Sequence, residues 1–192
     1  MTSISNKAAI SLLLLSALAG CATETARPLT SAQMPSLDAP YLLGAGDRLR
    51  ITVFGETGLT GEYAITGDGN VSFPLIGNVP AAGRKIEDVQ AAIDTRLAAG
   101  FIKQPRVSVE VLNYRPFFIL GEITKPGQYP FSIGLTLEQA IATAGGLTYR
   151  ANTHRIYLKR ALDTNEALVD LARNGSVAVL PGDTIRVAER FF

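Results

Sequence analysis

Short runs that alternate apolar and polar residues make up most of the chain after its first 40 residues, and glycine or proline bounds the runs. In the first run Leu49, Ile51 and Val53 alternate with charged or polar residues, as in a strand with one buried face. Helical patterns occur over 86–97 and 136–143. The sequence therefore predicts an α+β fold.

The composition of the chain is compatible with a hydrophobic core and argues against nucleic acid as a partner. A length of 192 residues allows one ordinary domain or two small ones. A hydrophobic content of 47% with 18% charged residues indicates a folded protein with a core. The formal net charge is +1, and basic residues are scattered singly or in pairs such as Arg84-Lys85. Binding to nucleic acid needs clustered cations, so no nucleic-acid partner is expected.

An apolar stretch, Ala8–Ala19, leads to Cys21, the single cysteine of the chain. The stretch is shorter than the roughly 20 residues that cross a bilayer, so it predicts a signal peptide over 1–20. Leu18–Cys21 resembles the lipobox of bacterial lipoproteins, which implies cleavage after Gly20 and acylation of Cys21. The alternative is an ordinary buried cysteine, although an unpaired reactive thiol would be a liability in an exported protein.

Residues 21–40 are rich in Thr, Ser, Ala and Pro and have no apolar period, which predicts a flexible tether. A coil of this length has ends about 25 Å apart and spans about 60 Å when stretched. Ala22 follows the cysteine. In bacterial lipoproteins an aspartate there favours the inner membrane, so we expect an outer-membrane lipoprotein with its folded part in the periplasm.

The first predicted domain covers 41–113. It opens with a glycine-bounded turn and a strand. Asp68-Gly69 then lies between two short β-type runs, which is a strong hairpin signal. A helix over 86–97 and a strand over 107–111 complete an α+β unit.

The second predicted domain covers 114–192 and has a β-grasp-like outline. Its helix is expected to begin with a capping box formed by Thr136 and Gln139. The segment 167–173 fits a short helix or a strand equally well. Strands are expected over 117–123, from 129 onwards, and over 156–159 and 185–187, and the turn Pro181–Asp183 precedes the last of them.

One sequence pattern occurs twice. Gly46–Ile51 and Gly182–Val187 share Gly-Asp-x-apolar-Arg-apolar. Either turn-into-strand chemistry has converged, with glycine for the bend and aspartate bonded to nearby backbone, or the two segments descend from a duplication.

The order of these motifs resembles the polysaccharide export protein family, the outer-membrane auxiliary lipoproteins of capsule and exopolysaccharide secretion. Tyr41–Val53 is similar to the family's opening motif, and Thr66–Gly77 to its Asp-Gly hairpin closed by Pro-x-x-Gly. Phe118–Tyr129, with Thr136–Gly146, resembles the soluble-ligand-binding β-grasp (SLBB) domain that follows. The resemblance implies a small polysaccharide-export α+β domain followed by an SLBB domain.

The resemblance also implies a function and a set of partners. The protein is expected to form a ring-shaped homo-oligomer that guides an exported polysaccharide, with the β-grasp layer against an inner-membrane co-polymerase or chain-length regulator. The longest family members carry a further β-grasp repeat and a helix that crosses the outer membrane. This sequence has one clear β-grasp unit, so a separate outer-membrane β-barrel channel is expected as a partner.

Polar and aromatic residues flank the predicted β-grasp turn, and this is the only sequence feature that indicates contact residues. Arg115, Lys125 and Tyr129 are expected to contact a partner or subunit. Phe191 and Phe192 are expected either to dock on a partner or membrane interface, or to complete the core.

Enzyme chemistry is not expected. His154 is the single histidine and is expected on a surface loop, so no metal site, cofactor or catalytic residue is predicted. The alternative function is a monomeric periplasmic β-grasp module that binds a small soluble ligand or carbohydrate.

Overall fold

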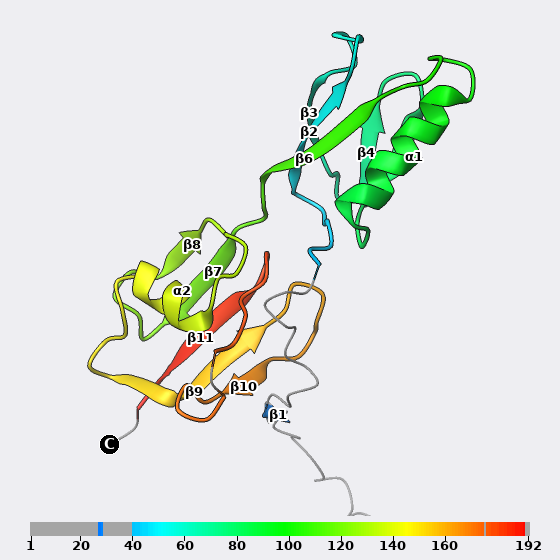
Figure 1. Cartoon of the computed structure of the whole chain (residues 1–192). Helices are drawn as coiled ribbons and strands as arrows, with labels where there is room; N and C mark the ends of the chain where they lie inside the picture. Colours follow the sequence, from blue (N-terminus) through cyan, green and yellow to red (C-terminus); the bar gives the residue numbers. More distant parts are fainter. Residues whose placement is uncertain (1–26, 29–39, 175, 191–192) are drawn as a thin grey trace, which may run out of the picture.

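The computed structural model describes residues 27–28, 40–174 and 176–190. Two hydrophobic clusters of buried side chains lie in separate parts of the chain, one within 43–109 and one within 117–187. Figure 1 shows two bodies joined by the stretch between β6 and β7. Each body combines strands with one helix, so the predicted α+β fold is confirmed.

The first domain is built on a three-stranded antiparallel sheet in the order β3-β2-β6. The strands are β2 (Arg48–Val53), β3 (Gly61–Ala64) and β6 (Val107–Asn113). In β2 the predicted alternation holds, because Leu49, Ile51 and Val53 are buried. Helix α1 (Ile86–Ala98) packs on β6 and β5 through Val89, Ile93 and Leu97, as its spacing predicted.

The hairpin of the first domain differs from the one expected. Strand β4 (Asn70–Phe73) pairs with β5 (Gly77–Pro80), the strand that follows it. The Asp68-Gly69 turn is present, but a single bridge between Ile65 and Val71 is its only strand pairing. The predicted turn and the pairing of its two flanking runs are therefore present in a minimal form, and the longer ladder of β4 is with β5.

The second domain is a six-stranded sheet in the order β1-β10-β9-β11-β7-β8. Helix α2 (Leu137–Thr143) packs its buried Leu137, Ala140 and Ile141 against one face. Strands β11 and β7 are parallel neighbours within it. The further strands are β7 (Phe117–Gly121), β8 (Gly127–Tyr129), β9 (Ala151–Lys159), β10 (Ala167–Val169) and β11 (Thr184–Glu189).

One local prediction in this domain is confirmed, and the structure assigns two segments that the sequence left open. The capping box is confirmed, because Thr136 Oγ1 accepts from the Gln139 N–H at 3.3 Å and Gln139 Oε1 accepts from the Thr136 N–H at 3.0 Å. The segment 167–173, which fitted a helix or a strand equally well by sequence, begins with strand β10. The segment 177–180, which the sequence analysis left unassigned, forms only an isolated bridge at Ala178.

Two residues of the predicted tether, Arg27–Pro28, form β1 and pair parallel with β10 at the edge of the sheet. Apart from Pro40, the rest of the tether lies outside the described residues, and so do the proposed cleavage and acylation site at Gly20 and Cys21 and the terminal Phe191 and Phe192. Within the described residues, no helix has the length and apolar character needed to span a membrane.

Candidate functional site

The junction between the two domains is organised by Asp47, whose side chain is fully buried. One carboxylate oxygen, Oδ2, accepts from the Tyr41 hydroxyl at 2.5 Å and from the Gly44 N–H at 2.8 Å. The other, Oδ1, accepts from the Arg115 N–H at 3.0 Å. The carboxylate therefore joins the start of the first domain to the first residues of the second. Burial and the neighbouring Asp47 raise the pKa of Tyr41.

Arg115 is part of this junction. Its side chain is 22% exposed, and its Nε lies 3.6 Å from Asp47 Oδ1. A Cβ placed on Gly44 would lie 1.7 Å from Arg115 Nη1, so only glycine leaves room for the guanidinium. Arg115 was expected to contact a partner or subunit, and the structure places it between this protein's own domains.

Asp183 repeats the arrangement of Asp47 at the start of β11. It is fully buried, and its Oδ2 accepts from the N–H three residues earlier, Leu180, at 2.7 Å. In both turns the aspartate N–H donates to the carbonyl three residues back at 3.1 Å. Arg160 donates to Asp183 Oδ2 at 2.5 Å. The repeated sequence pattern thus forms the same turn twice, whether through duplication or convergence.

Burial raises the pKa of Asp183 to about 6, although Arg160 and the Leu180 N–H act in the opposite direction. One reason is visible in the geometry, because Asp183 Oδ1 is buried and has no hydrogen-bond partner. That oxygen can hold a proton without losing a contact. Within the described residues, Asp47 and Asp183 are the only buried charged side chains.

Backbone and aromatic contacts link the two aspartate turns. The Gly182 N–H donates to the carbonyl oxygen of Pro116 at 3.0 Å. Pro116 is the residue that follows Arg115. The Tyr114 ring contacts Tyr41 edge-on at 4.9 Å and Phe131 at 5.6 Å, measured between ring centroids. The aromatic row therefore crosses from one domain to the other.

A cleft of about 630 Å³ opens beside this junction. Its walls are largely apolar, and Leu162 is 95% exposed. Its charged lining residues are Arg115, Arg160, Asp68 and Asp183. The cleft can therefore accept an apolar group and, beside it, a polar or anionic one. Apolar and aromatic members of the lining include Tyr41, Leu42, Phe131, Ile133, Leu135 and Leu162.

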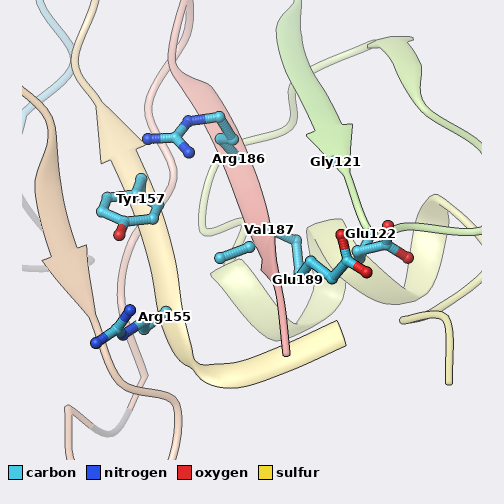
Figure 2. A pocket seen from close by; sticks show the side chains of 8 residues that line it. Gly121, Glu122, Arg155, Tyr157, Arg186, Val187 and Glu189 are labelled. Carbon is cyan, nitrogen blue, oxygen red and sulfur yellow. The ribbon is translucent and has the colours of Figure 1, made fainter. Parts of the chain in front are cut away.

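A second hollow, of about 350 Å³, lies on the sheet of the second domain, on the face opposite α2. Figure 2 shows Tyr157 between the guanidinium groups of Arg186 and Arg155. The Arg186 guanidinium lies 4.0 Å from the centre of the Tyr157 ring. Glu122 and Glu189 line the same hollow from the ends of β7 and β11.

Lys125 and Tyr129 do come together, as their place beside one turn suggested. The Tyr129 hydroxyl donates to Lys125 O at 2.6 Å, and the Tyr129 ring stacks on Phe117 with centroids 5.9 Å apart. Lys125 is exposed. Their role as contact residues stays a prediction.

His154 lies in strand β9 and not in a loop, with its Nδ1 3.1 Å from the Asp170 carboxylate. Among the described residues no group of three or more His, Cys, Asp or Glu side chains could hold a metal ion. The sequence analysis singled out neither Asp47, Asp183 nor Arg160 as functional. The signal for both aspartates was the repeated Gly-Asp pattern.

Two family models match the chain. Residues 35–112 match the polysaccharide biosynthesis/export protein model, and residues 116–179 match the SLBB domain. The boundary between the matches falls at the Asp47–Arg115 junction. Hereafter the first domain is called the export domain and the second the SLBB domain.

Curated proteins similar to this chain are named for polysaccharide production, export or transport. The exopolysaccharide production protein ExoF of Rhizobium meliloti (strain 1021) is 28% identical over 151 residues, covering 72% of this chain and 36% of ExoF. The EPS I polysaccharide export outer membrane protein EpsA of Ralstonia solanacearum is 28% identical over 190 residues, 82% of this chain and 50% of EpsA. The polysialic acid transport protein KpsD of Escherichia coli is 25% identical over 158 residues, 78% of this chain and 28% of KpsD.

The chain spans half or less of the length of these relatives. The two domain matches together cover most of the chain and occur in the order that the motifs predicted. This chain belongs to the polysaccharide export protein family, with an export domain followed by an SLBB domain.

Proposed function

We propose that this protein is a non-enzymatic component of the machinery that carries a capsular polysaccharide or exopolysaccharide across the outer membrane. The observation that carries the proposal is the pairing of an export domain with an SLBB domain through one buried junction at Asp47. The names of ExoF, EpsA and KpsD, which concern polysaccharide production, export or transport, support it.

Deletion of the gene tests this function. In a strain with no second copy, surface polysaccharide should be lost and should return when the wild-type gene is supplied on a plasmid. Normal surface polysaccharide in the deletion strain would refute the proposal.

Acylation of Cys21 anchors the protein to the outer membrane and holds its folded part in the periplasm. Six chain steps separate Cys21 from Arg27 in β1, and they span at most about 20 Å. The anchor therefore keeps the β10 edge of the SLBB sheet close to the membrane.

The chain leaves the export domain after β6 and enters the SLBB sheet at β7. Strands β11, β9 and β10 lie between β7 and β1 in that sheet. Figure 1 shows the export domain at the opposite end of the molecule from β1, which fits a position towards the inner membrane. This orientation gives the contact with the inner-membrane co-polymerase to the export domain, whereas the family resemblance suggested the SLBB layer.

Metabolic labelling with a fatty-acid analogue tests the anchor. The wild-type protein should carry the label and fractionate with the outer membrane, and Cys21→Ser should do neither. An unlabelled wild-type protein would remove this part of the proposal.

Self-association around the polymer path is the assembly that fits an export component, together with a separate outer-membrane channel. Exposed apolar side chains, among them Phe54 and Phe101 on the export domain and Ile133 on the SLBB domain, offer surfaces for subunits or partners. Mass photometry of the full chain in detergent should detect oligomers. A protein that stays monomeric, alone and with its partners, would contradict the assembly.

The cleft beside the junction favours a second candidate function, a monomeric module that binds a small soluble ligand or carbohydrate. Its volume of about 630 Å³ is in the range of small-molecule sites. A thermal shift caused by a metabolite in a strictly monomeric protein, with surface polysaccharide intact after deletion, would favour this function over export.

A further inference from the structure

On the face of the SLBB sheet opposite α2, strand register brings apolar and cationic side chains into one row. Strand register places Leu120 of β7 beside Arg186 of β11, and Arg186 beside Tyr157 of β9. Leu168 of β10 continues the row on the other side of Tyr157. Phe118 and Leu120, both on the outer face of β7, are 41% and 39% exposed. The row crosses four strands and is apolar except for Arg186, and we call it the apolar strip.

Tyr157 is held in place by its neighbour. Arg186 Nε donates to Glu166 Oε1 at 3.1 Å, and Arg186 Nη2 bonds the second oxygen of the same carboxylate. This two-point contact fixes the guanidinium over the Tyr157 ring. The guanidinium therefore covers one face of the Tyr157 ring and fixes its orientation, which leaves the other face and the ring edge for a ligand.

The charges on this face do not balance. Two of its carboxylates are ion-paired, Glu166 with Arg186 and Glu189 with Arg150, whereas Glu122 accepts from the neutral Thr148 hydroxyl and keeps its negative charge. Arg155 and Lys159, which flank Tyr157 on the same side of β9, have no ion-pair partner in the part of the chain that the structure describes. Among the described residues, the face thus presents two cations without an ion-pair partner, Arg155 and Lys159, against one such carboxylate, Glu122, and is net positive beside the apolar strip.

We propose that this face binds the exported polymer directly and that it is suited to an acidic glycan, one that carries carboxylate groups. The C–H face of a sugar ring packs on apolar and aromatic surface, because burial removes apolar area from water and the aromatic face is electronegative. Sugar carboxylates pair with Arg155 and Lys159, and arginine in particular binds carboxylates through two parallel N–H groups. The inference rests on the proposed export function and names the polymer class and the surface.

Charge argues for a glycan over a second copy of this chain as the occupant. The buried centres of protein interfaces are depleted in lysine, and Lys159 is exposed directly beside the strip. An acidic polymer instead supplies the counter-charge at every uronic-acid residue it places on the face. A subunit interface is the competing outcome in the test.

The test uses the full chain in detergent and two probes, a galacturonic-acid oligosaccharide and a neutral dextran oligosaccharide of equal length. Calorimetry should detect the acidic probe and not the neutral one, with affinity falling as salt increases. Arg155→Glu and Lys159→Glu should each weaken binding about tenfold or more, since a charge-assisted contact is lost and a repulsion gained. Lys103→Glu, the same charge change on an exposed residue of the export domain, should leave binding unchanged.

Three outcomes would overturn the inference: no binding of the acidic probe, equal binding of both probes, or equal loss in the Lys103→Glu control. A change of oligomeric state in Arg155→Glu, with probe binding unaffected, would show that the face is a subunit interface. The two proposals fail separately. A deletion strain with normal surface polymer refutes export, whereas a protein needed for export that ignores the acidic probe refutes only this surface.

Discussion

Replacing Asp47 with alanine should destabilise the protein more than a change at almost any exposed position. The side chain is fully buried and accepts from the Tyr41 hydroxyl and from the N–H groups of Gly44 and Arg115. Alanine leaves these donors without their acceptor, and a buried unsatisfied donor costs about 1–3 kcal/mol. It also removes the carboxylate beside the Arg115 guanidinium, and breaking such a pair costs about 3–5 kcal/mol.

These costs overlap, because water enters the vacated space and satisfies some of the donors. We therefore expect Asp47→Ala to lower the free energy of unfolding by about 3–5 kcal/mol in total. Asp47→Asn keeps the shape and one acceptor oxygen, so it should lose less. The junction should also open, which makes the connection at 113–117 a preferred site of proteolysis.

Urea unfolding followed by circular dichroism measures the loss, with Asp68→Ala as the matched control. Asp68 bonds only Thr66 and Asn70 within an exposed turn, so its removal should leave the midpoint almost unchanged. An Asp47→Ala protein within about 1 kcal/mol of wild type would refute the view that one carboxylate joins the two domains.

Other predictions concern the second turn, the glycine at the junction and the cap of α2. Burial raises the pKa of Asp183 from 3.8 to about 6, so the native state binds this proton more tightly than the unfolded chain and stability falls as pH rises through that window. Wild type should lose up to about 3 kcal/mol relative to Asp183→Asn between pH 4 and 7 in urea titrations, and parallel pH curves would contradict this. Gly44→Ala should cost about 1–3 kcal/mol because its Cβ displaces the Arg115 guanidinium, whereas Gly58→Ala, with open space around it, should not; equal midpoints would be the contrary result. Thr136→Ala should cost about 1 kcal/mol through loss of the α2 cap, and an unchanged melting temperature would count against that role.

Local periodicity was sufficient to predict elements whose partners are near in sequence. Helix α1 and strand β2 follow directly from apolar spacing, since Val89, Ile93 and Leu97 lie on one helix face and Leu49 and Ile51 on one strand face. The same holds for the α2 cap, which depends on two side chains three residues apart.

Predictions that depended on a choice between competing partners were less successful. Asp68-Gly69 formed its turn, yet β4 paired with β5 because Val71 and Val79 meet there in the core. Val177 and Val179, in a segment that the sequence analysis left unassigned, contribute to the core without a strand ladder. Sequence shows that such residues are apolar and does not show which strand edge is free.

The junction could be predicted only in part. The repeated Gly-Asp pattern was visible in the sequence, but its meaning depends on Arg115, which lies 68 positions after Asp47. Nothing local to Arg115 distinguishes a guanidinium held in a buried junction from one on the surface. The sheet face around Tyr157 was missed for the same reason, because strand register alone brings Leu120, Arg186 and Tyr157 into one row.

The location of newly made polymer tests the export function most directly. Cells in which the protein is rapidly depleted can be given a labelled sugar precursor, and labelled polymer can be measured inside the envelope and on the surface. If the protein exports polymer, synthesis continues, labelled polymer accumulates inside the envelope and surface label falls. Surface label that continues to appear at the undepleted rate, or synthesis that stops with no polymer inside, would contradict an export role.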